Sequence, residues 1–314
     1  MTNLPIDFEL KLRDYTENHL ASRNLSEATR QEYVKDISQL LHFLASTGST
    51  EPQNVNLTHL EAFLAEMDKE GSMFFGREDR PRGNLSGASR VRKTSSVKSF
   101  FGWLEQSGYI PRDISKRLIP PRKENKIPRV LSEREYKALE LAVANEPKAA
   151  AIIELLLQTG IRLSELANLR IGDIDLPNKV TKDENAVGEL FVRKGKGRRE
   201  RMVSLNYKAC QALKTWLRVR PELERVDTVF VSKFKRPMTP GGIQWLVGKY
   251  LEEAGVMGAH VHSLRHTFAT HMVKNGARLP TVRDMLGHNS LDTTSIYVSL
   301  ARDQMNKDVQ NYAL

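Results

Sequence analysis

The most informative motifs of this sequence lie between residue 260 and residue 297. This stretch contains His262-Ser263-Leu264-Arg265-His266, then Leu286-Gly287-His288, and finally Tyr297. On a helix, residues three apart share a face, so His262 and Arg265 lie together while Leu264 turns toward a core. The stretch therefore places phosphate-binding side chains, a second imidazole and a hydroxyl nucleophile on one short length of chain.

Each of these side chains also has an ordinary explanation. A lone tyrosine such as Tyr297 is most often a packing residue, and a phenol with a pKa of ~10 is almost fully protonated at neutral pH. His262 and His266 have the spacing of a metal-binding pair, but no glutamate follows the first histidine and no cysteine lies nearby. We therefore predict no metal site, and expect His266 and His271 to satisfy local hydrogen bonds.

A second candidate group lies upstream, around Arg162. Residues 148–159 form an apolar helical pattern that ends at Gly160, a residue type that favours the left-handed turn after a helix. Arg162 then opens the next helix, with Glu165 three residues further on as an orienting carboxylate. A guanidinium recognises phosphate through paired hydrogen bonds and keeps its charge, although a single arginine in this setting is more often a surface residue.

The charge of the chain points to a polyanionic partner. Its 314 residues carry a net charge of +10, and the cations are clustered. One cluster, on a predicted helix, consists of Arg90, Arg92, Lys93 and Lys98. Another, on a Gly-rich turn around Lys196, consists of Arg193, Lys194, Arg198, Arg199 and Arg201. We expect both to contact DNA phosphates, although for the helix alone an ordinary solvated face is an equal alternative.

The chain is predicted to form two domains. Ser26 and a capping box of Thr58 and Glu61 mark helix starts in the first, which has a loop over residues 71–87. The last helix of this domain has an apolar stripe of Val97, Phe100, Phe101 and Leu104. Three prolines in residues 119–128 forbid regular helix there. We therefore predict a first domain over residues 1–115, a linker over 116–128 and a second domain over 129–314.

The second domain is predicted to be mainly helical with a small sheet. Ser132 and Glu135 form a capping box at its start. Residues 190–192 and 202–205 read as short strands on either side of the basic Gly-rich turn, which makes a hairpin. Helices should follow over residues 207–219, 239–254, 263–274 and 280–286. The expected fold class is therefore mainly α, of the α+β kind.

Several classes of protein are excluded by the sequence. No apolar run approaches the ~20 residues that a membrane span needs, and the first twenty residues lack the apolar core of a signal peptide. The single cysteine, Cys210, excludes an internal disulfide and fits a reducing cytosol. No glycine-rich phosphate loop ending in Gly-Lys-Ser/Thr is present, so we expect neither ATP-driven chemistry nor a cofactor.

Six positions, taken in order, carry a family resemblance: Arg162, Lys196, His262, Arg265, His288 and Tyr297. The surrounding text agrees, in Thr159-Gly160-Ile161-Arg162-Leu163-Ser164-Glu165-Leu166, Gly195-Lys196-Gly197 and Leu286-Gly287-His288-Asn289-Ser290. Each short motif is weak alone, whereas six positions in the right order are specific. Over essentially its whole length the chain resembles the tyrosine recombinase (phage integrase) family, and its Xer-type members most closely.

The resemblance implies a clamp around double-stranded DNA, made of a SAM-like helical core-binding domain and a mixed, mostly helical catalytic domain. It implies that Tyr297 attacks the scissile phosphorus and forms a 3′-phosphotyrosine, without metal or nucleotide. Lys196 would protonate the leaving 5′ oxygen, although the neighbouring Lys194 stays an alternative. His262 would assist proton transfer, and Glu165 would support the site. The residues that stabilise the charged transition state would be Arg162, Arg265 and His288.

The resemblance also implies partners and a setting. Strand exchange through a Holliday junction would need a homo-tetramer, or a hetero-tetramer with a related recombinase, on two copies of a specific DNA site in the cytoplasm, associated with the nucleoid. The tail after Tyr297 would either dock on a neighbouring protomer or be a frayed terminus. The cellular role stays open between chromosome or plasmid dimer resolution and integration or excision of a mobile element.

Two other functions are alternatives at this point. A catalytically lapsed, DNA-binding accessory protein would keep the fold but not the activity, and the complete set of six residues argues against it. A type IB topoisomerase would share the phosphotyrosine chemistry, and the short Xer-like sequence disfavours it.

Overall fold

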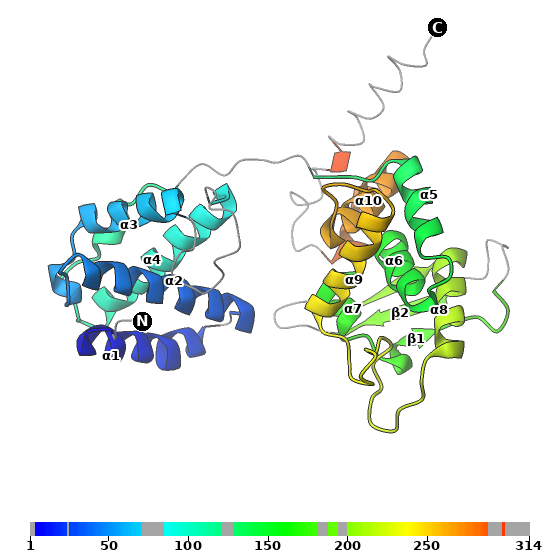
Figure 1. The fold of residues 1–314 in the computed structure, drawn as a ribbon, viewed down its shortest axis with the longest axis horizontal. Helices are drawn as coiled ribbons and strands as arrows, with labels where there is room; N and C mark the ends of the chain where they lie inside the picture. The colour runs from blue at the N-terminus through cyan, green and yellow to red at the C-terminus, as the bar shows by residue number, and fades with distance from the viewer. Residues whose placement is uncertain are drawn as a thin grey trace, which may run out of the picture. The chain divides into compact units, whose positions relative to one another are not determined.

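The computed structural model describes residues 4–23, 25–70, 85–120, 128–180, 188–193, 200–287 and 297–298. The chain divides into two compact units, residues 1–126 and residues 127–314, and each has its own hydrophobic core (Figure 1). The described parts are mostly helical, with one small antiparallel sheet, as the sequence predicts. Among the helices of these parts, none has the length and apolar character required to cross a bilayer.

The first unit is a bundle of helices around an aromatic core. Its helices are α1 (Ile6–Asp14), the π-helix η1 (Tyr15–Leu20), α2 (Glu27–Ser46), α3 (Leu57–Glu70) and α4 (Gly87–Gln106), with short 3-10 turns at Pro52–Asn54 and Ile114–Arg117. The predicted stripe of α4 is confirmed, because all four of its apolar side chains are at most 1% exposed. They pack among fully buried aromatic rings, which include Phe8, Tyr15 and Phe63.

The start of α2 is as predicted, whereas the start of α3 is not. The hydroxyl of Ser26 accepts a hydrogen bond from the backbone of Thr29 at 3.1 Å and caps α2. In α3 the cap is the carboxamide of Asn56, which accepts from the backbone of His59 at 3.0 Å. The predicted capping box at Thr58 is therefore wrong: Asn56 caps as well as threonine or better, and the helix begins just before that box.

The first unit extends past the predicted domain end at residue 115. The 3-10 turn Ile114–Arg117 packs against α4, and Lys116 pairs with Glu105 at 2.6 Å. Leu118 is 4% exposed and belongs to the core of this unit. The side chain of Leu118 packs into the core, although the prolines and basic residues around it in the sequence predict a linker.

The second unit is built around α6 (Pro147–Thr159), whose apolar side chains are buried on nearly every side. The other helices are α5 (Glu133–Ala142), α7 (Leu163–Ala167), α8 (Tyr207–Val219), α9 (Pro240–Glu253), α10 (Val261–Lys274) and α11 (Leu279–Leu286). The predicted capping box of Ser132 and Glu135 is present at α5, and the predicted helices agree with α8 to α11 to within two residues.

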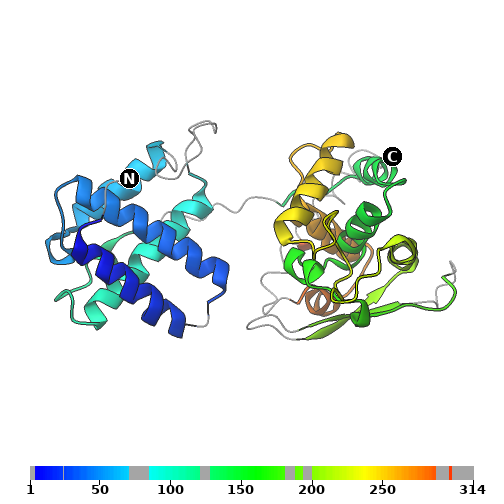
Figure 2. The same ribbon diagram turned by 60° about the horizontal axis from the view of Figure 1, so that its bottom comes forward.

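The sheet of this unit contains the predicted hairpin. Strands β2 (Gly188–Val192) and β3 (Arg201–Leu205) pair antiparallel, with Leu190 opposite Val203. A third strand, β1 (Ile174–Asp175), pairs with the other edge of β2 and was not predicted, because two residues carry no alternation of polar and apolar positions. The sheet lies along one edge of the unit, with α6 and α8 against β3 (Figure 2).

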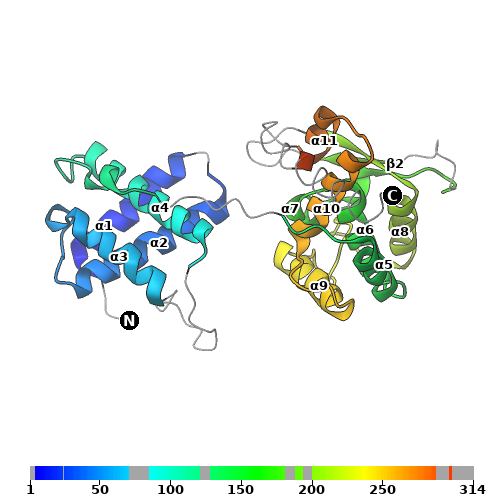
Figure 3. The same ribbon diagram turned by 90° about the horizontal axis from the view of Figure 1, so that it is seen from above.

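Helix α10 connects the two sides of the second unit. It packs on α6, and it lies between α11 on one side and α9 on the other (Figure 3). Helix α11 in turn packs against β3. The start of α7, the start of β3, the middle of α10 and the end of α11 are thereby brought together. The first three of these places carry Arg162, Arg201 and Arg265, and the end of α11 contributes backbone carbonyls.

Candidate active site

Arg162 is held by the turn between α6 and α7. Gly160 ends α6 in the left-handed region with φ 61°, so the chain reverses and Arg162 becomes the N-terminal cap of α7. Its backbone N–H donates to Oε2 of Glu165 at 3.0 Å, and its Nη1 donates to Oε1 of the same carboxylate at 2.9 Å. The three-residue spacing seen in the sequence thus becomes a direct ion pair.

Glu165 is shared between two arginines. Arg201, at the start of β3, donates Nη1 to Oε1 at 3.1 Å and Nη2 to Oε2 at 2.8 Å. Burial of the carboxyl by itself would raise its pKa, but the hydrogen bonds from Arg201 and Arg162 outweigh burial and lower the pKa of Glu165 to about 2. Glu165 is therefore ionised at neutral pH and can hold both guanidinium groups.

The last turn of α11 provides a backbone acceptor for each of three arginines. The carbonyl of Met285 accepts from Nε of Arg201 at 2.8 Å, and that of Leu286 accepts from Nη2 of Arg265 at 2.9 Å. The next carbonyl, of Gly287, accepts from Nη2 of Arg162. The C-terminal end of a helix carries partial negative charge, so it suits cations that crowd together.

Arg265 is the more deeply buried of the two predicted phosphate-binding arginines. It is 6% exposed, and its Nη1 also donates to the carbonyl of Gly160 at 2.5 Å. Burial, and then the neighbouring Arg162, lower the pKa of Arg265 to about 10. The guanidinium stays protonated at neutral pH, and its two backbone partners fix its plane.

Tyr297 lies beside α10, the helix that carries Arg265. Its hydroxyl is 3.1 Å from Nδ1 of His266, the residue after Arg265, and its side chain belongs to the hydrophobic cluster that contains Phe268 and Leu286. The side chain is 2% exposed, and burial raises the pKa of Tyr297 while Arg265 opposes the rise. Burial, followed by the nearby His262 and Arg265, lowers the pKa of His266 to about 4, so the ring is neutral near pH 7 and can accept the phenol proton in a hydrogen bond.

His262 has a more open position at the start of α10. Its ring is exposed to solvent and lies edge-on to that of His260, with centroids 5.9 Å apart. The buried part of the ring, and then His260 and Arg265, lower the pKa of His262. A neutral imidazole is the form that accepts a proton. Across the described residues, no three His, Cys, Asp or Glu side chains are grouped so that they could hold a metal ion.

Five of the predicted site residues lie outside the described residues. These are Lys194, Lys196, Arg198 and Arg199, which lie between β2 and β3 in the sequence, and His288, the residue after Gly287 in the sequence. The residues that flank them are described: Arg193 pairs with the carboxylate of Asp173 at 2.6 Å and keeps about half of its side chain, 54%, exposed.

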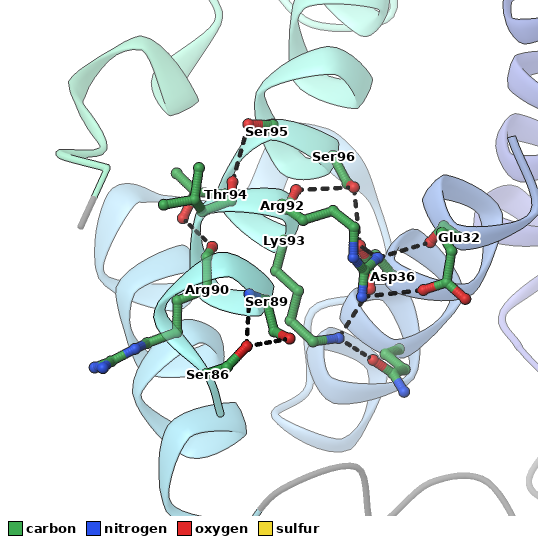
Figure 4. Close-up of polar contacts among 12 residues, drawn as sticks. Glu32, Asp36, Ser86, Ser89, Arg90, Arg92, Lys93, Thr94, Ser95 and Ser96 are labelled. Atoms are coloured by element: carbon green, nitrogen blue, oxygen red, sulfur yellow. Dashed lines mark hydrogen bonds and ion pairs between the residues drawn. The ribbon is translucent and has the colours of Figure 1, made fainter. Parts of the chain in front are cut away.

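The cations of α4 do not all face solvent. Lys93 is 4% exposed, and its ammonium binds Asp36 at 2.9 Å and Gln39 at 2.5 Å. Arg92 binds the same Asp36 and, at 3.1 Å, Glu32, whereas Arg90 points away from this cluster (Figure 4). The predicted phosphate contact of Lys93 is therefore corrected, because a carboxylate buried in the bundle requires a buried cation beside it.

The predicted DNA contact of Arg201 is also corrected. Its side chain is 11% exposed and is turned inward to Glu165 and the end of α11. Sequence reasoning missed this, because it placed Arg201 with the other cations of the basic turn.

For His266 the sequence analysis predicted only an unspecified local hydrogen bond, whereas its partner is the hydroxyl of Tyr297. The position of His266 directly after Arg265 was the available signal.

Comparisons with known proteins identify the family of both parts of the chain. Residues 129–304 match the phage integrase family, and residues 12–108 match the phage integrase N-terminal SAM-like domain. The tyrosine recombinase XerC of Oceanobacillus iheyensis is 33% identical over 310 residues, which covers 95% of this chain and 94% of the relative.

Solved structures show the same likeness. The crystal structure of XerA recombinase is 26% identical with a TM-score of 0.51, and the match covers 98% of this chain and 99% of that one. XerH site-specific recombinase, bound to a palindromic difH substrate, shares the fold with a TM-score of 0.72 at 19% identity, over 98% and 97% of the two chains. The chain therefore belongs to the phage integrase family and is a tyrosine-type site-specific DNA recombinase.

Proposed function

We propose that this recombinase cuts and rejoins DNA through a covalent bond to Tyr297, without a metal or a nucleotide cofactor. The observation that carries the proposal is the meeting of Arg162, Arg265 and Tyr297 in one place. Arg162 and Arg265 are hydrogen-bonded to successive carbonyls of α11, and Tyr297 packs on α10 and α11 beside them. Two fixed cations next to a hydroxyl nucleophile suit attack on a phosphodiester.

In the proposed step the phenol oxygen of Tyr297 forms a bond to the scissile phosphorus while the bond from phosphorus to the 5′ oxygen breaks. The negative charge that grows on the phosphate is stabilised by Arg162, Arg265 and His288. The phenol proton is transferred to a base with the assistance of His262, and Lys196 gives a proton to the departing 5′ oxygen. The products are a 3′-phosphotyrosine and a free 5′-hydroxyl, and attack by a different 5′-hydroxyl reverses the step. Glu165 supports the site.

The state of Tyr297 in the structure fits the DNA-free protein. Its hydroxyl is hydrogen-bonded to His266, and burial raises the pKa of Tyr297. The nucleophile is therefore protonated and buried. Attack on DNA then requires that the hydroxyl leave His266 for the phosphate. The neighbouring cations can lower the cost of deprotonation once the phosphate is in place.

The proposed assembly is a tetramer, of this chain alone or with a related recombinase, on two copies of a specific site. Strand exchange would pass through a Holliday junction. The relatives named XerC and the lambda integrase tetramer solved on a Holliday junction support this assembly.

The biological role would be resolution of chromosome or plasmid dimers, or integration and excision of a mobile element, in the cytoplasm and in association with the nucleoid. DNA contacts are assigned to Arg90, Arg92, Lys98, Arg193, Lys194, Arg198 and Arg199.

A covalent trapping experiment tests this function. The DNA would be a nicked suicide duplex, carrying a site selected from random duplexes by binding to the full-length protein. We expect wild type to form an adduct that withstands denaturation, also in excess EDTA, and Tyr297→Phe to form none while it binds DNA as tightly. Tyr250→Phe is the matched control, because Tyr250 is a similarly buried tyrosine, 5% exposed, on α9. An adduct at wild-type yield in Tyr297→Phe would refute the assignment of the nucleophile.

A further inference from the structure

Arg201 occupies a position that DNA binding does not explain. It is the first residue of β3, directly after the basic turn, yet its side chain is only 11% exposed. Its guanidinium spans two elements of the site. Both Nη atoms bind the carboxylate of Glu165, at 3.1 and 2.8 Å, and Nε binds the carbonyl of Met285 at 2.8 Å. This planar, forked arrangement is specific to arginine.

These contacts link Arg201 to both predicted phosphate-binding arginines. Through Glu165 it reaches Arg162, which binds Oε1 of that carboxylate at 2.9 Å. Through the end of α11 it reaches Arg265, because the carbonyl next to that of Met285 is the acceptor of Arg265. Arg201 therefore contacts Glu165, which holds Arg162, and the end of α11, which holds Arg265, although its own side chain is turned away from solvent.

The packing around Gly287 shows how closely this arrangement is built. Gly287 has φ 63°, and a Cβ atom placed on it would lie 3.0 Å from Nη1 of Arg201 and 3.1 Å from Nη1 of Arg162. The two guanidinium groups thus lie against the same backbone turn. A shift of one of them leaves space into which the turn, and with it the other arginine, can move.

We propose that Arg201 is a positioning residue of the active site: it fixes Glu165 and the last turn of α11, so that Arg162 and Arg265 are presented to the scissile phosphate in a set geometry. The inference rests on the proposed phosphotyrosine chemistry and adds a residue to it. Arg201 is the first residue of β3, so its contacts also connect the start of this strand to the arginine site.

Loss of Arg201 should act through Glu165. The carboxylate faces Arg162 at the start of α7, Arg201 on β3 and, further away, Arg265 on α10, while α11 contributes carbonyls. Without Arg201, a buried carboxyl loses two of its charged hydrogen bonds and is more easily protonated. Protonated Glu165 holds Arg162 less well, and a displacement of ~1 Å in a catalytic group can cost about 10²-fold in rate.

The experiment measures single-turnover cleavage of the nicked suicide duplex at saturating full-length protein, for Arg201→Met, Arg201→Lys, Glu165→Gln and the double variant Glu165→Gln/Arg201→Met. We expect Arg201→Met to cleave about 10²-fold more slowly, and Arg201→Lys to recover part of the rate. The defect of Arg201→Met should grow as the pH falls from 8 toward 5. In the Glu165→Gln background, Arg201→Met should cost less than it does in the wild type, because only its contact with α11 is then lost, and it should add no pH dependence.

A matched control separates positioning from a general loss of stability. Arg220 is also a buried arginine, 9% exposed, and it is held by the backbone carbonyls of residues 221, 226, 228 and 229. Arg220→Met should lower the melting temperature but leave the cleavage rate of the folded protein within about twofold of wild type, at each pH. DNA affinity of Arg201→Met should keep its salt dependence, whereas a lost phosphate contact lowers the slope by about one.

The outcomes are distinct. Wild-type cleavage by Arg201→Met together with a smaller salt slope would show that Arg201 binds DNA and overturn the inference. The inference also fails if the full rate loss persists in the Glu165→Gln background and is the same at every pH. Absence of an adduct in the wild type would instead count against the proposed function.

Discussion

Substitution of Gly160 by alanine should disturb the backbone turn that holds both Arg162 and Arg265. Gly160 ends α6 with φ 61°, its carbonyl holds Arg265, and the turn that it forms leads directly to Arg162. A Cβ atom at this position would lie 2.5 Å from Cδ1 of Phe268 and 2.8 Å from Cδ2 of Leu286. Both of these side chains pack with Tyr297.

The cost has two parts. A left-handed backbone costs an L-residue roughly 1–2 kcal/mol, and forcing an added methyl group into packed side chains costs typically about 1–3 kcal/mol. The free energy of unfolding of Gly160→Ala should therefore fall by about 2–5 kcal/mol. For a unit of this size, each kcal/mol lowers the melting temperature by roughly 2–4 °C.

Gly255→Ala separates the two parts. Gly255 also follows a helix, with φ 68°, but a Cβ atom there would meet nothing within 4 Å. It should show the backbone cost alone, about 1–2 kcal/mol, and any change in the unfolded chain is common to both variants. Calorimetry of the full chain would measure the difference, and the suicide duplex would measure cleavage, which should fall tenfold or more in Gly160→Ala at a temperature where it is folded.

Equal melting temperatures for the two alanine variants would refute this reasoning. The close approach of Gly160 to Phe268 and Leu286 would then have no energetic consequence. A stability loss without a cleavage defect would refute the second half, namely that the end of α6 fixes Arg265.

Two further predictions concern buried charges. Lys93→Met should destabilise the protein by about 3–5 kcal/mol, because it leaves Asp36 buried with a weaker partner, and it should leave the salt slope of DNA binding unchanged. Lys98→Met, at a partly exposed position of the same helix, should instead lower the salt slope and change the stability little. A smaller slope in Lys93→Met would contradict the structure. Burial raises the pKa of Glu154 above its ordinary value of 4.5, so the folded protein loses stability as the pH rises through that raised pKa. Glu154→Gln should therefore melt higher than wild type at pH 8 and lose this advantage near pH 4; an advantage that is the same at both would be inconsistent with that ionisation.

Much of the architecture could be predicted because its signals are local. Ser132 and Glu135 cap α5 as their spacing predicts, and Gly160 ends α6 in the left-handed region. The hairpin of β2 and β3 is predicted from two short strand-like runs, residues 190–192 and 202–205, on either side of a Gly-rich stretch of sequence. Each of these features depends on neighbours within a few residues, which the sequence contains in full.

What could not be predicted depends on contacts between distant residues. The sequence does not show that Lys93 pairs with Asp36, 57 positions earlier, or that Arg201 pairs with Glu165, 36 positions earlier. In both cases a cation inside a basic cluster looked like a DNA contact, because composition cannot tell which of several neighbouring cations is turned toward a buried carboxylate. The fold decides this by bringing one carboxylate next to one particular strand or helix.

The charge balance of the site explains why it can exist before DNA arrives. Arg162, Arg201 and Arg265 lie close together around a single carboxylate, Glu165, and their mutual repulsion contributes to the lowered pKa of Arg265. The carbonyls of Gly160 and of residues 285–287 offset part of this repulsion with helix-end dipoles. At a pKa of about 10 Arg265 still keeps its proton near pH 7, whereas a lysine, whose ordinary pKa is about 2 units lower than that of arginine, would be far closer to losing its charge under the same burial. A phosphodiester can neutralise the remaining excess of positive charge among these described residues. Under the proposed chemistry, the arrangement that costs stability in the free protein would therefore favour binding of the scissile phosphate.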